Sequence, residues 1–249
     1  MNKKDLKNIR VSILEMVRKA NEGHIPSAFS VVELLYVIYS KMEKNDSFFL
    51  SKGHASAALY AVLAHFNYLD KKYLETFCQY DSKLGGHPHR NPPHIMNSSG
   101  SLGHGFPMAC GYALGKKILK ESGRVFCLIG DGESNEGTIW ETALYVKHLE
   151  LNNLVCIVDN NNSQGRAVIS DNLKGKFSSF GWEVYEIDGH NISEIEKTLF
   201  IDHSLKKPLC VVANTKKGKG IKIMEEDYFT WHHKSPSDEE FNLFLKELS

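Results

Sequence analysis

The sequence predicts an α/β fold in which a parallel sheet carries helices on both of its faces. Two observations support this prediction: short, almost uninterrupted apolar runs recur along the chain, and segments with helical periodicity separate them. A strand that is apolar on both sides is typical of a parallel sheet buried between two layers of helices. The predicted strands are residues 125–129, 154–159, 182–187 and 209–213, with helices at 135–149 and 192–200.

The N-terminal region is predicted to begin with two helices. Apolar residues recur at helical spacing over residues 1–20, which indicates an amphipathic helix. Pro26 marks a break in the chain after this helix. Ser30 is predicted to cap the next helix, which runs to about Met42, because a serine oxygen accepts hydrogen bonds from the first free amides of a helix.

The middle of the chain predicts one more strand, one more helix and a long loop. Residues 48–50 form a short apolar strand, and residues 55–66 form a helix rich in small residues. Residues 81–105 are rich in Gly, Pro, His, Ser and Asn and lack periodicity, which favours a functional loop. We find no repeat or linker and predict a single domain over residues 1–249, with residues 219–249 as a C-terminal tail.

The composition excludes several classes of protein. The chain has 249 residues and can bury a core without disulfides, and its 30 basic and 30 acidic residues give no reason to expect nucleic acid or a membrane surface as a partner. The five cysteines form no CxxC pair, which favours reduced thiols. No run approaches the ~18 apolar residues of a membrane helix, and the N-terminus does not resemble a signal peptide. We therefore expect a soluble, cytoplasmic protein.

Two predicted strands end in polar residues suited to a metal ion. Gly130-Asp131-Gly132 follows the strand at 125–129, and Asn161 and Ser163 follow the strand at 154–159. An Asp-Gly pair alone is more typical of an ordinary turn. In a right-handed crossover, however, both strands end at the same edge of the sheet, where open α/β folds bind ligands. Asp131, Asn161 and the Ser163 carbonyl are then hard oxygen ligands for one Mg²⁺, and the helix that follows Gly132 directs its positive end toward a diphosphate.

These two strand ends resemble the thiamine diphosphate motif, and the blocks around them resemble the diphosphate-binding region of the transketolase family. The resemblance extends from Gly23-His24 to the segment 231–234, with the blocks in the order found in the family. It implies the thiamine-diphosphate-binding fold, with the diphosphate-binding domain only. It also implies thiamine diphosphate and Mg²⁺ as cofactors, with Ca²⁺ or Mn²⁺ as substitutes. Asp131, Asn161 and Ser163 would hold the metal, while Asn161, Gly130 and Gly132 would also contact the cofactor.

Four histidines receive roles from this resemblance. His54, in Ser51-Lys52-Gly53-His54, would contact the diphosphate, and His24 would contact the hydroxyl or carbonyl oxygens of the donor sugar. His87 would face the same pocket. His232 would lie near both substrate and diphosphate, although His233 is an alternative for this role. Breaking a carbon–carbon bond of a ketose moves protons on and off hydroxyl groups, and an imidazole with a pKa near ~6.5 is suited to this task.

The remaining blocks carry weaker expectations. The segment containing Gly100, Ser101 and Leu102 resembles one that holds the aminopyrimidine ring through its backbone. Glu136 would complement the positive end of a helix and lie near the partner chain at an interface. The run 216–220 resembles a loop near the cofactor, so its lysines are no reason to expect nucleic acid. No role is assigned to His89, His94 or His104, and a structural role is expected for His65, His148, His190 and His203.

The resemblance also implies that a second chain is needed. Complete transketolases carry another α/β domain that binds the aminopyrimidine ring and supplies a catalytic glutamate, for which this sequence offers no candidate. We expect a C-terminal transketolase-like partner of roughly 300 residues, which contains the pyrimidine-binding domain, in an α₂β₂ assembly. The complete enzyme would be a transferase that moves a two-carbon ketol unit from a ketose phosphate to an aldose.

Two other functions remain open from the sequence. A 1-deoxyxylulose-phosphate-synthase-like chain would decarboxylate pyruvate, and a non-catalytic thiamine-diphosphate-binding subunit would be structural or regulatory. A nicotinamide-dependent enzyme is disfavoured because no G-x-G-x-x-G follows a strand. The chain departs from the family pattern at Pro26, at Pro88-His89-Arg90 and at Gly103-His104-Gly105. These positions favour an unusual sugar, with Arg90 as a candidate contact to a phosphate or carboxylate.

Overall fold

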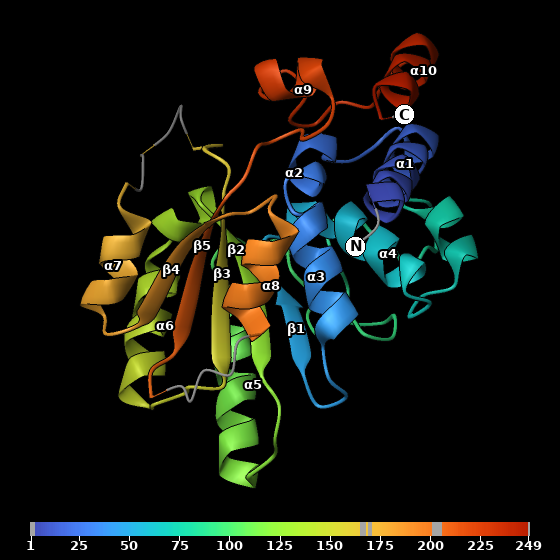
Figure 1. The fold of residues 1–249 in the computed structure, drawn as a ribbon. Coiled ribbons are helices and arrows are strands. Elements are labelled where there is room, and N and C mark those ends of the chain that lie inside the picture. Colours follow the sequence, from blue (N-terminus) through green and yellow to red (C-terminus); the bar gives the residue numbers. More distant parts are fainter. Residues whose placement is uncertain (1–2, 165–167, 169–170, 201–205, 249) are drawn as a thin grey trace.

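The fold is built on one parallel sheet, seen in a computed structural model that describes residues 3–164, 168, 171–200 and 206–248. Its five strands have the order β1-β2-β3-β5-β4 (Figure 1). Every neighbouring pair is parallel, so the carboxyl ends of the strands share one edge of the sheet. The strands are β1 (Ser47–Leu50), β2 (Val125–Gly130), β3 (Leu154–Asn160), β4 (Glu183–Asp188) and β5 (Leu209–Asn214).

Helices cover both faces of this sheet, as predicted. Phe126 and Leu128 of β2 point into one core, whereas Val125, Cys127 and Ile129 point into a second core on the other face. This alternation buries both sides of the strand and explains its uninterrupted hydrophobicity. The first core includes α1 (Lys3–Ala20), α2 (Ile25–Phe29), α3 (Val32–Lys41), α4 (Ser56–His65) and α8 (Ile192–Phe200), and the second includes α5 (Gly105–Leu119), α6 (Gly137–His148) and α7 (Leu173–Ser179).

The region between α1 and α3 differs from the prediction. Pro26 lies in the first turn of the short helix α2, where its missing N–H leaves no helical bond unmade. Ser30 does not cap α3, because the N-cap residue is Val31 and makes no side-chain cap. The Ser30 hydroxyl instead contacts the buried Asp159 Oδ2 at 2.7 Å. The Ser30 oxygen in turn accepts a bond from Lys52 Nζ at 3.2 Å, so a buried ammonium takes the place of the helix amides as its donor.

Helix α5 was not predicted, because glycines interrupt its pattern. Gly111 and Gly115 both lie inside the helix, and each lowers helix propensity by about 1 kcal/mol relative to alanine. Gly105, by contrast, is required by packing: a Cβ atom there would lie 2.5 Å from Ser51 Cα. This close contact places the first turn of α5 directly behind the end of β1.

The segment predicted as a tail contains α9 (Lys222–Glu226) and α10 (Asp238–Glu247). Trp231, Phe241 and Phe244 are buried in the same core as α1, which holds this segment against the body of the fold (Figure 1). Ser237 starts α10 with a capping box in which it exchanges hydrogen bonds with Glu240. The division of the chain into a single domain stays a prediction.

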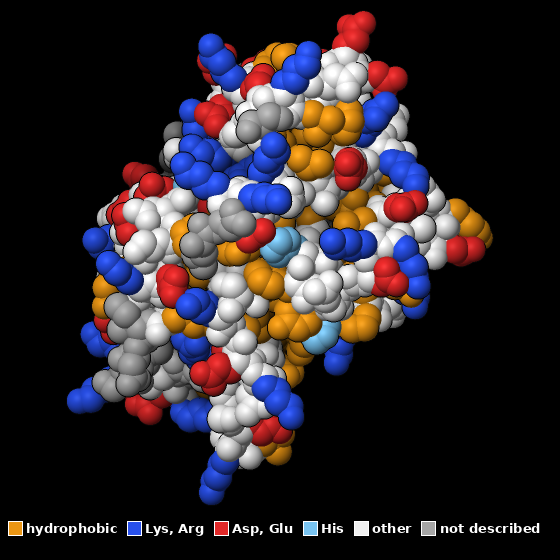
Figure 2. Space-filling model, turned by 45° about the vertical axis from the view of Figure 1, so that its right-hand side comes forward, with side chains coloured by type: hydrophobic (Ala, Val, Ile, Leu, Met, Phe, Trp, Pro, Cys, Tyr) orange, Lys and Arg blue, Asp and Glu red, His pale blue; other side chains and the backbone are white. Residues whose placement is uncertain are grey.

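The surface agrees with the balanced charge of the sequence. Figure 2 shows one face of the molecule, on which basic and acidic side chains are interspersed and hydrophobic side chains are exposed between them. The formal net charge is zero at pH 7. No helix in the described part of the chain is long and apolar enough to cross a bilayer.

Candidate active site

A cavity of about 310 Å³ opens where β1, β2 and β3 end. Its walls come from loops that are far apart in the sequence and meet at this edge of the sheet. Most of the candidate residues line it together. The lining residues are His24, Lys52, His54, His87, Gly100, Leu102, Gly130, Asp131, Gly132, Glu133, Ser163 and His232.

The two strand ends that predicted the metal site are neighbours. Gly130 of β2 pairs with Asp159 of β3, and the Asp131 amide donates to the Asp159 carbonyl at 3.1 Å. The Ser163 hydroxyl donates to Asp131 Oδ1 at 3.0 Å, and the Gly132 amide donates to the same oxygen at 2.8 Å. The second carboxylate oxygen, Oδ2, is buried and has no hydrogen-bond partner among the described residues.

The unpartnered Oδ2 atom of Asp131 is the observation that decides whether the site fits a metal ion. Burial and the nearby Asp159 raise the pKa of Asp131, so its charge is unfavourable in the protein alone. Buried polar atoms normally have a partner, and a divalent cation bound by hard oxygens would supply one. No group of three or more His, Cys, Asp or Glu side chains in the described residues is arranged to hold a metal. A metal bound at Asp131 would therefore need the amide and carbonyl oxygens of the second strand end.

Asn161 is held beside this point but does not line the cavity. Its Nδ2 atom donates to Asp159 Oδ2 at 2.8 Å, and its Oδ1 atom accepts a bond from the Ser163 amide at 3.0 Å. These two bonds define the orientation of the side-chain amide, with its nitrogen toward Asp159 and its oxygen toward Ser163. An amide oxygen has two lone pairs, so Oδ1 keeps one for another partner. Its role as a metal ligand stays a prediction.

The sequence analysis missed two buried charges at the cavity, one on the lining residue Lys52 and one on Asp159. Lys52 is 1% exposed and forms an ion pair with Asp159, which is fully buried. Asp159 also accepts bonds from Ser30 and Thr215. Although burial raises the pKa of Asp159, the Lys52 ammonium and these bonds hold it below its ordinary value. The Asp159 carboxylate therefore stays charged, and it accepts the hydrogen bond that orients Asn161.

Glu133 joins three loops of the cavity wall and was also missed. Its carboxylate accepts bonds from the Gly103 amide at 2.8 Å, from the Gly130 amide at 3.1 Å and from the Ser51 hydroxyl. Burial raises its pKa despite these donors. Glu133 is 2% exposed and lines the cavity, so these bonds fix the geometry of the wall.

The predicted histidines gather around His24. The centre of its ring lies 5.6 Å from that of His54, 6.3 Å from that of His87 and 5.3 Å from that of His232. Burial, with neighbouring imidazoles and Lys217, lowers the pKa of His24 to about 3. Burial and Lys217 lower the pKa of His232 to about 4. The pKa of His54 is well below its ordinary value, because of burial and Lys52, and burial lowers that of His87. All four are therefore neutral at pH 7.

His232, and not His233, lines the cavity. His232 Nδ1 lies 2.8 Å from the Lys217 Nζ atom. Lys217 is 2% exposed, and no carboxylate lies within ion-pair distance of it in the described part of the chain. Burial and the nearby Lys52 lower its pKa to about 8. His233 instead pairs with Glu22 at 2.6 Å and is about half exposed.

The segment predicted to hold the aminopyrimidine only partly faces the cavity. Gly100 and Leu102 line it, whereas Ser101 is exposed and does not. Gly103 has φ +78°, and a Cβ atom there would lie 2.3 Å from Thr138 Oγ1, so only glycine fits. Glu136 is an exposed residue at the N-cap of α6, beside Gly103.

Arg90, the candidate anion contact, and the three loop histidines without an assigned role lie outside the lining. Arg90 and His89 are exposed in the loop, His94 packs on Tyr68, and His104 is the N-cap residue of α5. None of the four touches the cavity wall as described. His203 lies outside the described residues.

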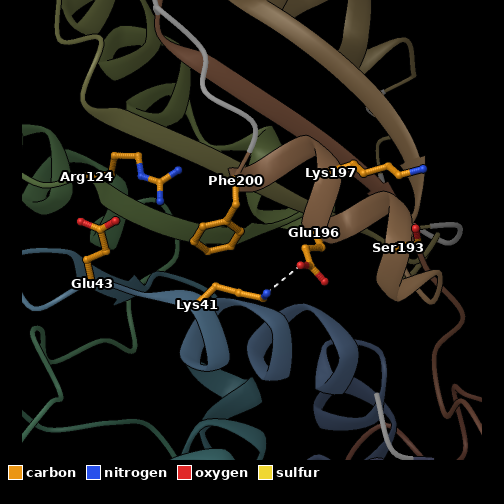
Figure 3. Close-up of a pocket in the computed structure, with 7 residues that line it drawn as sticks. All are labelled: Lys41, Glu43, Arg124, Ser193, Glu196, Lys197 and Phe200. Carbon is orange, nitrogen blue, oxygen red and sulfur yellow. Dashed lines mark ion pairs between the residues drawn. The ribbon is translucent and has the colours of Figure 1, made fainter.

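A second cavity, of about 600 Å³, lies at the opposite end of the strands (Figure 3). Figure 3 shows the side chains of Lys41 and Glu196 meeting across it, and their charged atoms are 2.7 Å apart. The Arg124 guanidinium lies near the ring of Phe200, at 4.7 Å from its centre. Among the described residues, none that lines this cavity has a buried side-chain oxygen without a hydrogen-bond partner, in contrast to Asp131 at the other edge.

Comparison with known proteins identifies the class of domain that this fold and site define. Residues 1–240 match the family described as the thiamine diphosphate binding domain of transketolase. The chain belongs to this family.

Among its relatives, one of the subunits of the apulose-4-phosphate transketolase of Phocaeicola vulgatus is 34% identical, over 96% of this chain and 91% of that protein. The protein of the same name from Actinobacillus succinogenes is 37% identical, over 91% of this chain and 87% of that protein. Human transketolase is 35% identical over 93% of this chain, but only 39% of its own length is matched. The crystal structure of Campylobacter jejuni transketolase covers 100% of this chain and 43% of its own, with a TM-score of 0.91 at 28% identity.

Proposed function

We propose that this chain is the half of a two-chain transketolase that binds thiamine diphosphate and Mg²⁺. The complete enzyme transfers a two-carbon ketol unit from a ketose phosphate to an aldose. The observation that carries this proposal is the buried Asp131 Oδ2, which has no partner among the described residues and lies at the wall of a cavity between two strand ends. Mg²⁺ is the preferred ion because the candidate ligands are all oxygens, and Ca²⁺ or Mn²⁺ would substitute. Asp131, Asn161 and the Ser163 carbonyl would hold it.

The cavity supplies positive charge for a diphosphate. Lys217 is a buried ammonium without a carboxylate partner among the described residues, so an anion in the cavity would stabilise it. Lys217 lies behind the lining residue His232, at 2.8 Å from its Nδ1 atom, whereas Lys52 lines the cavity itself but shares its charge with Asp159. Amides near Gly132 and the neutral ring of His54 add hydrogen-bond donors. We assign the diphosphate to this group of residues.

The neutral imidazoles are suited to the sugar substrate. When bound, thiamine diphosphate supplies the electron sink for carbon–carbon bond cleavage. His24, His87 and His232 line the cavity, and a neutral imidazole can accept a proton from a substrate hydroxyl oxygen or donate one to a carbonyl oxygen. Their lowered pKa values keep one nitrogen of the His24 ring and one of the His87 ring available to accept. His232 Nδ1 already accepts from the Lys217 ammonium, so the ring of His232 offers its Nε2 proton as a donor. Positive charge is thereby concentrated on the lysines and the metal, away from the sugar.

The affinity for thiamine diphosphate is expected to fall as the pH rises. The pKa of Lys217 is about 8 in the free protein, and a bound anion raises it. Below that pH the ammonium is already present, whereas above it binding must also take up a proton, which weakens the affinity by at most about tenfold per pH unit. Titration calorimetry at saturating Mg²⁺ measures this slope. Lys217→Met should bind more weakly at neutral pH and lose the slope, whereas Lys216→Met, at the exposed neighbour, should keep it. An unchanged slope in Lys217→Met contradicts this assignment.

An apolar face beside the cavity is suited to a second chain. The exposed side chains of Met108 and Tyr112 on α5 and of Leu144 and Tyr145 on α6 lie in two helices that pack together. A hollow of about 320 Å³ lies between these helices. Thr138 lines this hollow and donates to the carbonyl of Gly103 at 3.0 Å, and Gly103 directly follows Leu102, which lines the first cavity. A partner on this face would reach the rim of the cavity.

This partner is proposed to be a C-terminal transketolase-like chain of roughly 300 residues with the pyrimidine-binding domain, in an α₂β₂ assembly in the cytoplasm. Two relatives of similar length are each named as one subunit of a transketolase, which supports a separate second chain. We expect ketol transfer only when both chains are present. The test is an assay of each purified chain and of their mixture. Full activity of this chain by itself contradicts the proposal.

The choice of donor separates this function from its alternatives. The names of two relatives make apulose 4-phosphate the first ketose phosphate to assay, beside xylulose 5-phosphate and pyruvate. Turnover of pyruvate alone would favour a synthase that decarboxylates it. Thiamine diphosphate binding without turnover of any donor, in the complete complex, would favour a structural or regulatory role.

A further inference from the structure

His190, which was expected to be purely structural, connects a buried ion pair to the loop that carries Lys217. It lies directly after β4, in a turn packed against the end of β5. The Gly189 amide donates to the Asn214 carbonyl at 2.8 Å, and a Cβ atom on Gly189 would lie 2.4 Å from Thr215. The turn after β4 and the end of β5 are therefore in contact. His190 lies between these segments and helix α3, which carries Glu33.

The hydrogen bonds of His190 determine its tautomer. Its Nε2 atom accepts a bond from the Lys216 backbone amide at 2.8 Å, so this nitrogen carries no proton. The proton is then on Nδ1, which donates to Glu33 Oε2 at 3.0 Å. Glu33 also forms two bonds with Arg10, at 2.8 and 2.9 Å. The imidazole thus connects a buried carboxylate on α3 to the backbone of residue 216.

Residue 217 is fixed by backbone bonds on both of its sides. Lys216 is held through its amide by His190, and the Gly218 amide donates to the Pro26 carbonyl at 3.0 Å. The Lys216 side chain pairs with Glu225 at 2.5 Å, whereas the Lys217 side chain reaches His232. His190 therefore determines the backbone position from which Lys217 extends.

We propose that His190 is a positioning residue for the diphosphate site, because it fixes the backbone that places the Lys217 ammonium beside His232. This inference rests on the proposed function, since it assumes that Lys217 binds the diphosphate. It assigns His190 no contact with cofactor or substrate. Loss of the imidazole leaves Glu33 paired with Arg10 through two hydrogen bonds, so the packing of α1 against α3 is expected to persist.

The test uses the two-chain complex with thiamine diphosphate and saturating Mg²⁺. His190→Ala is expected to raise the apparent KM for thiamine diphosphate about tenfold, the size of effect seen when a group that orients a ligand is removed, with kcat at saturating cofactor little changed. His190→Gln should restore KM to within about twofold, because its amide nitrogen can donate to Glu33 while its oxygen accepts from the Lys216 amide. His148→Ala, at an exposed histidine of α6, is the control and should leave KM unchanged.

A double-mutant cycle decides whether His190 acts through Lys217. In a Lys217→Met background, His190→Ala should raise KM by less than about twofold, because the group that it positions is already gone. An equal increase in both backgrounds, or no increase in the wild-type background, overturns the proposal. Failure of the wild-type complex to bind thiamine diphosphate would instead refute the proposed function, so the two failures are distinguishable.

Discussion

Asp131→Asn is expected to abolish Mg²⁺-dependent cofactor binding at ordinary concentrations while leaving the cofactor-free chain at least as stable as wild type. The substitution replaces the unpartnered Oδ2 atom and removes the charge that would hold the ion. Removal of one partner from a buried charge pair costs about 3–5 kcal/mol, which weakens binding by roughly a hundredfold to a few thousandfold. Ketol transfer by the complex should fall in parallel.

The stability of the cofactor-free chain changes in the opposite direction. The folded pKa of Asp131 is raised, so the folded chain holds this proton more tightly than the unfolded chain does. Its contribution to stability is therefore present at low pH and is lost as the pH rises through the folded pKa. Asparagine is neutral and avoids this loss at pH 7. Without cofactor, the melting temperature of the variant should equal or exceed that of the wild type. Addition of thiamine diphosphate and Mg²⁺ should not raise it further.

Thermal unfolding with and without the cofactor and metal measures both effects. Asp81→Asn is a suitable control, because Asp81 is exposed and its left-handed backbone, with φ 61°, is one that asparagine tolerates. The control should keep the increase caused by the ligands. A large increase that persists in Asp131→Asn shows that the metal binds elsewhere and contradicts the assignment of the site.

The sequence predicted those parts of the site whose signals are local. The ends of β2 and β3 were found because each apolar run stops at a polar residue, and parallel pairing then brings the two ends to one edge of the sheet. His24, His54 and His87 were found because each follows a glycine in a recognisable block. The same local patterns predicted the parallel sheet and the family, and both predictions are confirmed.

The missed residues depend on partners that are distant in the sequence. Asp159 is an ordinary polar strand end until the fold brings Lys52 and Thr215 to it. Ser30 has the pattern of a helix cap, yet its hydroxyl goes to the same carboxylate. His190 has no motif that reveals its contact with Glu33. Such pairings are decided by three-dimensional packing, which no local pattern in one sequence specifies.

The second large effect is expected from Lys52→Met, which should destabilise the cofactor-free chain by about 3–5 kcal/mol. The methionine side chain fills a similar space but leaves the fully buried Asp159 carboxylate without its cation. For a domain of this size, such a loss corresponds to a decrease in melting temperature of roughly 10 °C. Lys52→Met with Asp159→Asn should recover part of the loss, because the buried charge is then absent while an oxygen remains to accept from Ser30.

The pH dependence of this loss identifies its cause. In the wild type the pKa of Asp159 is held low, so its contribution to stability is present above the unfolded pKa and is lost as the pH falls through the folded pKa. Without Lys52, burial dominates and raises the pKa of Asp159, so the variant is penalised most at neutral pH and less in acid. Urea unfolding at pH 5 and pH 7.5 should therefore show a smaller difference between variant and wild type at the lower pH. A difference that is the same at both values would mean that Lys52 acts through packing of its aliphatic chain, because only an uncompensated carboxylate can take up a proton and thereby relieve the cost of its burial.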